Sequence, residues 1–296
     1  MSKEKKKKSS SFTTWLLVLL MLAGLSLLLY PTFADWWNSF HASRAIATYS
    51  ESIASMDTGK IDEMWKEAVA YNSESFQPNA MLGKITDEQS ERYKKTLDVS
   101  GTGIMGYVEI PKIRVELPIY HGTDETILQI AIGHLENTTL PVGGPSTHAV
   151  ISGHRGLPSA KLFTDIDQLV EGDTFMLQVL GRTLTYEVDQ IRVVLPTELS
   201  NLVIEENMDY CTLVTCTPYG INSHRLLIRG RRTENAAEEI YVPADATQIR
   251  PIFIAPFVGA PILLFLLIYL LISTSRRRRN WCMKGEDYER KKEYIR

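Results

Sequence analysis

The stretch Thr212-Leu213-Val214-Thr215-Cys216-Thr217-Pro218-Tyr219-Gly220-Ile221-Asn222-Ser223-His224-Arg225 decides the fold of this chain. Its first half is apolar and β-branched, which is typical of a buried strand that ends at Cys216. Pro218 and Gly220 then predict a turn. A second apolar run follows at 226–228, so we expect the chain to return as a neighbouring strand that begins with Arg225. This arrangement places a thiol at the end of one strand and a guanidinium at the start of the next.

A thiol beside a cation is suited to covalent catalysis. A cationic neighbour favours the thiolate, and a guanidinium can stabilise a developing oxyanion. Without further information, a lone cysteine in a strand is more often an inert packing residue.

The residues around Cys216 resemble those of a known family. Thr212-Leu213-Val214-Thr215-Cys216 resembles the Thr-Leu-x-Thr-Cys active-site signature of sortases, and Arg225 falls where the sortase arginine lies. His148-Ala-Val-Ile-Ser-Gly-His154-Arg-Gly156 is similar to the histidine segment of that family. The resemblance implies a catalytic set of Cys216, His154 and Arg225, with Thr215 as a candidate substrate-binding residue.

The chain is similar to the pilin-polymerising class C sortases of Gram-positive bacteria in three features: the sequence Cys-Thr-Pro-Tyr-Gly at 216–220, two apolar segments and a long N-terminal arm. This resemblance implies cleavage of a Leu-Pro-x-Thr-Gly-like sorting signal between Thr and Gly. A thioester on Cys216 would then pass the acyl group to a lysine of another pilin subunit. Two alternatives remain open: a sortase that anchors proteins to a cell-wall peptidoglycan precursor, and a non-enzymatic pilus-assembly scaffold in the membrane.

His154 follows a predicted strand and lies between two glycines, which lets the backbone approach a ligand. We expect it to protonate the leaving amine and to deprotonate the incoming one. His224, beside Arg225, is the rival histidine. We interpret Arg155 as a surface or turn residue and Cys211 as a packed, inert thiol.

Composition excludes some functions. The net charge is −3, and the basic runs do not alternate with aromatic residues, so we expect no nucleic-acid partner. Cys211 and Cys216 would lie about 16 Å apart on one strand, too far for a disulfide, which needs Cα atoms within about 7 Å. No metal-ligand spacing of Cys or His is present, and we expect no cofactor.

Two uncharged apolar runs, 12–30 and 252–272, predict membrane segments. Each has a basic cluster at its outer end, and basic residues favour the cytoplasmic side. We therefore expect a two-pass protein of the cell membrane with cytoplasmic termini and an extracytoplasmic catalytic domain. The first run could instead be a signal sequence cleaved after Ala34.

Between these runs the pattern changes from helix to strand. An amphipathic stripe at Ile61, Met64, Trp65, Ala68 and Val69 predicts an arm helix, separated at 58–59 from the preceding helix. Residues 72–103 are polar. Class C sortases carry a lid here that plugs the active site through an Asp-Pro-aromatic anchor, and no such tripeptide is present in this stretch. The loop is therefore either open or plugged by another side chain such as Phe76 or Met81. Thr86 with Gln89 predicts a capped helix start.

The remaining elements are short. Strands are predicted at 107–110, 115–120, 149–152, 175–179, 183–188 and 191–194, with a tight turn at Gly181 and short helices around 126–132 and 161–169. Many short strands favour a barrel or a sandwich, and the sortase resemblance implies a closed eight-stranded β-barrel, mainly β in class. The expected divisions are cytoplasmic 1–11, transmembrane 12–33, arm and lid-like region 34–100, catalytic barrel 101–232, linker 233–251, transmembrane helix 252–272 and cytoplasmic tail 273–296.

Overall fold

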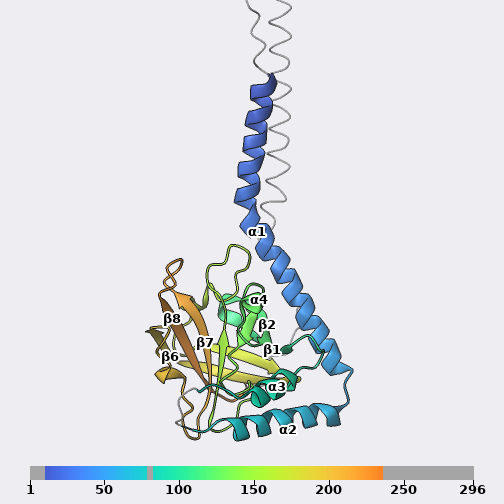
Figure 1. Cartoon of the computed structure of the whole chain (residues 1–296), viewed down its shortest axis with the longest axis vertical. Coiled ribbons are helices and arrows are strands. Elements are labelled where there is room, and N and C mark those ends of the chain that lie inside the picture. Colours follow the sequence, from blue (N-terminus) through green and yellow to red (C-terminus); the bar gives the residue numbers. More distant parts are fainter. Residues whose placement is uncertain (1–10, 79–82, 236–296) are drawn as a thin grey trace, which may run out of the picture. The chain divides into compact units, whose positions relative to one another are not determined.

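The structure is a computed structural model that describes residues 11–78 and 83–235 (Figure 1). Three helices precede a region of eight strands. The helices are α1 (Ser11–Ala54), α2 (Thr58–Ser75), α3 (Asp87–Lys95) and, between strands, α4 (Glu125–Leu128). The strands are β1 (Ile104–Ile110), β2 (Val115–His121), β3 (Ile132–His134), β4 (Thr147–Ser152), β5 (Thr174–Val179), β6 (Arg182–Val194), β7 (Asp209–Thr217) and β8 (His224–Arg232).

The strands close into a barrel in the order β1-β2-β3-β4-β7-β8-β6-β5. The barrel is mixed, because β2 pairs with β3 and β4 pairs with β7 in parallel, while the other pairs are antiparallel. The predicted closed eight-stranded barrel is therefore confirmed. The parallel β4–β7 pair joins the histidine segment to the cysteine segment.

Two strand predictions needed correction. The runs 183–188 and 191–194 belong to one strand, β6, whose register shifts between Val188 and Gln190. This shift leaves an extra residue on β6, as in a β-bulge. The three-residue strand β3 was not predicted. The tight turn at Gly181 is confirmed: Leu180 and Gly181 have φ of 49° and 73°, as a two-residue hairpin with two left-handed positions requires.

Alternation along the strands separates a barrel interior from an outer layer. On β7, Cys211 and Leu213 belong to the main core, whereas Val214 packs on a smaller outer cluster with Val150 of β4 and Leu227 of β8. Side chains two residues apart on a strand share a face. Odd-numbered residues of β7 therefore face the barrel interior, and even-numbered residues face outward.

The predicted apolar segment 12–33 and the first arm helix form one continuous helix, α1, with Pro31 inside it. Its C-terminal half packs on the barrel. Tyr49 is 1% exposed, donates its hydroxyl hydrogen to the Met105 carbonyl at 3.0 Å and accepts the Leu180 N–H at 2.9 Å. Burial raises the pKa of the Tyr49 hydroxyl to about 12. α1 is thus fixed to β1 and to the β5–β6 turn.

The breaks between the helices follow from capping. Asp57 caps α2 by accepting the Gly59 N–H, so the expected break between helices lies just before Thr58. The capping box predicted for Thr86 and Gln89 is confirmed at the start of α3.

Within residues 11–78 and 83–235, one helix, Val18–Ala54, is long and apolar enough to cross a membrane by length and composition. The second predicted membrane segment, 252–272, lies outside the described residues. So do the tail 273–296 and the linker 233–251 beyond Asn235.

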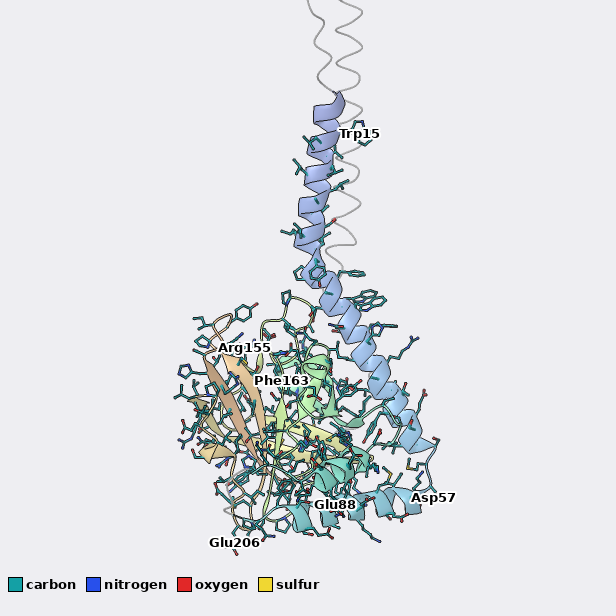
Figure 2. All side chains as sticks on the ribbon, in the orientation of Figure 1. Trp15, Asp57, Glu88, Arg155, Phe163 and Glu206 are labelled. Atoms are coloured by element: carbon teal, nitrogen blue, oxygen red, sulfur yellow. The ribbon has the colours of Figure 1, made fainter. Side chains whose placement is uncertain are left out.

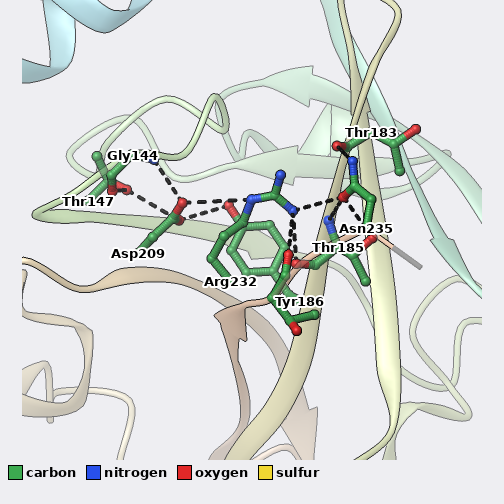
Figure 3. Close-up of polar contacts among 9 residues, drawn as sticks. Gly144, Thr147, Thr183, Thr185, Tyr186, Asp209, Arg232 and Asn235 are labelled. Atoms are coloured by element: carbon green, nitrogen blue, oxygen red, sulfur yellow. Dashed lines mark hydrogen bonds and ion pairs between the residues drawn. The ribbon is translucent and has the colours of Figure 1, made fainter. Parts of the chain in front are cut away.

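The start of β7 is held by a polar network (Figure 3). The Asp209 carboxylate accepts the Gly144 N–H at 2.8 Å and the Tyr186 hydroxyl at 3.0 Å, and lies 3.9 Å from the Arg232 guanidinium. Burial raises the pKa of the Asp209 carboxyl. These contacts fix the end of β7 that lies away from Cys216.

Candidate functional site

Cys216 lies on the outer face of the barrel. Val214 packs in the outer cluster, and Cys216 follows it by two residues on the same strand. The two side chains therefore share a face, and that of Cys216 lies outside the core. Its side chain is partly exposed, and Cys211 and Cys216 are both free thiols. The predicted absence of a Cys211–Cys216 disulfide is confirmed.

Arg225 faces Cys216 across the β7–β8 pair. The two residues are direct register partners in an antiparallel ladder, so their side chains share one face. The guanidinium donates to the backbone carbonyls of Asn222 at 3.3 Å and His224 at 3.1 Å. These contacts tie the guanidinium to the loop that precedes β8.

His154 is brought to Cys216 from the other side. In the parallel β4–β7 pair Ser152 is opposite Val214, and the Gly153 N–H donates to the Val214 carbonyl at 3.0 Å, which extends the ladder past the end of β4. Continuing this register by two residue pairs beyond Ser152 and Val214 would bring His154 level with Cys216, and neighbouring strands are about 4.8 Å apart. The strand that carries Cys216 therefore lies between the segment that leads to His154 and the strand that carries Arg225.

The position of His154 is fixed by the packing of its neighbour. Gly153 is buried, and a Cβ built on it would lie 2.7 Å from both Ile132 and Phe163 side-chain atoms. The Phe163 N–H also donates to the His154 carbonyl at 3.1 Å, which closes the loop that follows. A larger residue at position 153 would therefore require either this segment or the Ile132 and Phe163 side chains to shift.

Thr215 contributes to the same positioning. It is 1% exposed, and its hydroxyl donates to the Gly153 carbonyl at 2.8 Å. The predicted substrate-binding role of Thr215 gains no support from this burial. The hydroxyl instead joins the cysteine strand to the residue before His154.

A carboxylate lies beside His154 that sequence reasoning missed. Glu125, the first residue of α4, has Oε1 at 3.6 Å from the His154 Nε2, and 70% of its side chain is exposed. Among the described residues, this buried Nε2 atom has no hydrogen-bond partner. A carboxylate at this distance attracts a protonated imidazole and can orient it. Nothing in the sequence near Glu125 indicates this contact.

Three other histidines have environments that differ from that of His154. His134 and His148 are buried, and burial lowers the pKa of these imidazoles to about 3 and about 4, respectively. His224, the rival, is the register partner of Thr217 and so lies on the opposite face of β8 from Arg225. Its ring nitrogen Nδ1 is 2.9 Å from the Ser223 hydroxyl.

Two further expectations concern neighbouring residues. Arg155 lies in the bend after β4, as expected of a turn residue, but its side chain is not free on the surface: it is 12% exposed, pairs with Asp167 and donates to the Thr217 hydroxyl at 3.3 Å. Cys211 is fully buried, and burial raises the pKa of its thiol well above the ordinary value, as expected of an inert packing residue.

The α2 and α3 helices of the arm lie at the other end of the barrel from the site. Figure 2 shows Arg155, next to His154, at one end, and Glu88 of α3 and Asp57 before α2 at the other. Phe76, a candidate plug, packs its ring at 6.0 Å from the ring of Tyr71 and against the main core. Met81, the other candidate, lies outside the described residues.

A closed barrel that presents a thiol between an imidazole and a guanidinium defines a class: enzymes that act on acyl groups through a cysteine. The comparisons with known proteins agree. The family described as "Sortase domain" matches residues 108–233. Given this match and a sortase structure that the chain covers in full at 48% identity, the chain belongs to the sortase family of cysteine transpeptidases.

Relatives come from several bacteria. Sortase D of Bacillus subtilis (strain 168) is 32% identical over 130 residues, which are 43% of this chain and 63%, less than two thirds, of that relative. The crystal structure of sortase C1 from Streptococcus agalactiae is 48% identical with a TM-score of 0.63, covering 65% of this chain and 100% of that chain. The crystal structure of Streptococcus pneumoniae sortase C is 44% identical with a TM-score of 0.58, covering 66% of this chain and 99% of that chain.

Proposed function

We propose that this chain is a membrane-anchored class C sortase that polymerises pilin subunits. It cleaves a Leu-Pro-x-Thr-Gly-like signal between Thr and Gly and transfers the acyl group to a lysine amine of another subunit. The observation that carries this proposal is the strand register: Arg225 is the β8 partner of Cys216, and the parallel β4–β7 pair leads the chain to His154 on the other side of the cysteine strand.

The chemistry runs through a thioester on Cys216. Its sulfur attacks the carbonyl carbon of the scissile Thr–Gly bond, and Arg225 stabilises the negative charge that develops on the carbonyl oxygen. His154 gives a proton to the leaving glycine amine, so the C–N bond breaks and the thioester remains. The incoming lysine amine then loses its proton to His154 and attacks the thioester, which releases the Cys216 thiolate.

Identity to class C structures supports the polymerising role. The sortase C of Streptococcus pneumoniae, one of these structural relatives, is an enzyme whose structure bears on pilin substrate specificity. The second candidate, anchoring to a peptidoglycan precursor, is favoured by one observation: residues 72–103 lack the Asp-Pro-aromatic anchor of a class C lid. The non-enzymatic scaffold requires that the cysteine site be idle.

Membrane placement is part of the proposal. α1 carries the first span, and the run 252–272 carries the second, so that residues 34–251 lie outside the cell and both termini lie in the cytoplasm. The apolar composition of α1 and the basic clusters at the outer ends of the two runs support this two-pass topology.

The test uses the full chain in detergent micelles. Wild type, Cys216→Ala and the control Cys282→Ser, which removes a thiol outside the catalytic region, are each incubated with a pilin that carries the sorting signal. Products are followed on denaturing gels and by intact mass. We expect wild type and Cys282→Ser to form covalent ladders, and Cys216→Ala to form none.

The three candidates give different products. Covalent ladders that form with wild type and are absent with Cys216→Ala support polymerisation. An acyl-enzyme mass that is resolved by a peptidoglycan-like amine, and never by a pilin lysine, would favour the anchoring enzyme. Neither an acyl-enzyme nor a ladder, with several sorting peptides, would leave only the scaffold.

A further inference from the structure

Exposed aromatic rings follow the apolar part of α1. We call this set the aromatic collar; it consists of Phe33, Trp36, Trp37 and Phe40, which are 60%, 41%, 52% and 49% exposed. Neighbouring rings of the collar lie 5.8 to 6.5 Å apart. Exposed tryptophans at the end of an apolar helix are typical of the membrane–water interface, where an apolar ring with a polar edge is stable.

The same turns of α1 are bonded to the loop that follows His154. The Lys161 N–H donates to the Asp35 carboxylate at 2.9 Å, and the Asn38 amide donates to the Ser159 carbonyl at 2.8 Å. α1 is continuous here and rises about 1.5 Å per residue, so Asp35 lies about 8 Å beyond Tyr30, the last residue of the apolar run. This distance is comparable to the depth of one headgroup layer, about 5–8 Å.

The β7–β8 loop is held against that loop. A Cβ built on Gly156 would lie 2.7 Å from the ring of Tyr219, so the ring packs directly on the Gly156 backbone. Tyr219 is nevertheless 61% exposed, and Ile221, near the tip of the same loop, is 71% exposed. Two large apolar side chains therefore project from the end of the barrel that α1 holds at the level of the collar.

We propose that the barrel rests on the bilayer surface with its Cys216 end, and that Tyr219 and Ile221 enter the interfacial layer together with the aromatic collar. The proposal rests on α1 as a membrane span, not on the transpeptidase chemistry. An exposed apolar loop could instead bind a protein. Tyr219 of this loop packs on Gly156, and the loop that follows His154 is bonded to α1 at collar level through Asp35 and Asn38, which favours lipid.

The test measures lipid contact directly. The full chain, in a background of Cys216→Ala and Cys282→Ser, is placed in nanodiscs of phosphatidylcholine and phosphatidylglycerol that carry a nitroxide on a fraction of their headgroups. A fluorescent bimane is attached through Ile221→Cys or, as a matched control, through Glu206→Cys, which is exposed at the opposite end of the barrel (Figure 2). Aqueous iodide is the second quencher.

We expect the label at 221 to lose about half of its fluorescence to the headgroup nitroxide, since interfacial side chains enter about 5–10 Å into this layer. The label at 206 should respond to iodide alone. Adding Asp35→Ala and Asn38→Ala should reduce nitroxide quenching at 221, because both bonds between α1 and the His154 loop are removed. Because the background lacks Cys216, a failed transpeptidation assay does not affect this result.

Equal iodide quenching at 221 and 206, with no nitroxide quenching at 221, would overturn the proposal. The loop would then be free in water and available to a protein partner. Nitroxide quenching at 221 that persists unchanged after Asp35→Ala and Asn38→Ala would overturn the part of the proposal that assigns the orientation to α1.

Discussion

A side chain larger than hydrogen has no room at position 153, because Ile132 and Phe163 atoms would lie 2.7 Å from a Cβ there. The residue is next to His154, and its amide extends the β4–β7 ladder. A shift at Gly153 therefore moves the imidazole relative to Cys216. Catalysis is sensitive to such shifts: a misplacement of about 1 Å can cost about 100-fold in rate.

Gly153→Ala should lower kcat by about 10- to 100-fold while the barrel still folds, with a loss of about 1–3 kcal/mol in the free energy of unfolding from overpacking. Gly172→Ala is the matched control: its φ is +91°, so alanine is strained, but nothing lies within 4 Å of its Cβ. Thermal melts and single-turnover acylation are measured for both variants. If the two lose kcat equally, the packing of Gly153 does not position His154.

At the scale of elements, the Tyr49 hydroxyl is one of the contacts that attach α1 to the barrel. Tyr49→Phe removes the acceptor of the Leu180 N–H and the donor to the Met105 carbonyl, and both backbone groups are left without that partner in a buried region. We expect a loss of about 2–4 kcal/mol, since each orphaned buried polar group costs about 1–3 kcal/mol. Urea unfolding of the full chain in micelles measures it.

Tyr219→Phe is the matched control for that variant, because the Tyr219 side chain is largely exposed, and its hydroxyl should contribute less than about 0.5 kcal/mol. A change in Tyr49→Phe no larger than in the control would show that α1 docking does not depend on this hydroxyl.

The elements that sequence reasoning predicted are those with a strong local pattern. β7 and β8 have apolar runs that predict where Cys216 and Arg225 lie, but the catalytic roles of these two residues were assigned through the sortase resemblance. His154 was assigned only through the sortase resemblance. β3 has three residues, too few to show alternation, and the register shift after Val188 made β6 look like two strands. Glu125 could not be predicted, because its contact with His154 depends on how α4 packs.

At the scale of the whole molecule, two buried neutral imidazoles make stability depend on pH. Burial lowers the pKa of His134 to about 3 and of His148 to about 4, whereas the unfolded value is about 6.5. Between these values the unfolded chain binds protons that the folded chain does not. The free energy of unfolding is therefore not reduced by these two histidines above about pH 6.5. It falls by roughly a few kcal/mol as the pH drops toward about 4.

Thermal melts of the full chain between about pH 7 and pH 5 should show this decrease, in a range where most carboxylates remain ionised. The double variant His134→Gln, His148→Gln should be less stable near neutral pH, because ring-nitrogen contacts to Thr139 and Val203 carbonyls are removed. Its melting temperature should change less over the same interval. An unchanged slope would show that these histidines do not carry the acid sensitivity.

The parallel pairing of β4 with β7 also governs when the site can form. Gly153 and Thr215, which the pairing joins, are 62 residues apart in the chain, and Arg225 follows later still. Contacts between such distant segments form slowly, because a long loop must close first. When the chain is delivered from its N-terminus, the His154 segment precedes Cys216, but Arg225 follows it, so the Cys216 thiol lacks its guanidinium neighbour until β8 has been delivered. The set of three residues is therefore complete only when β8, the last strand in the described part of the chain, closes the barrel.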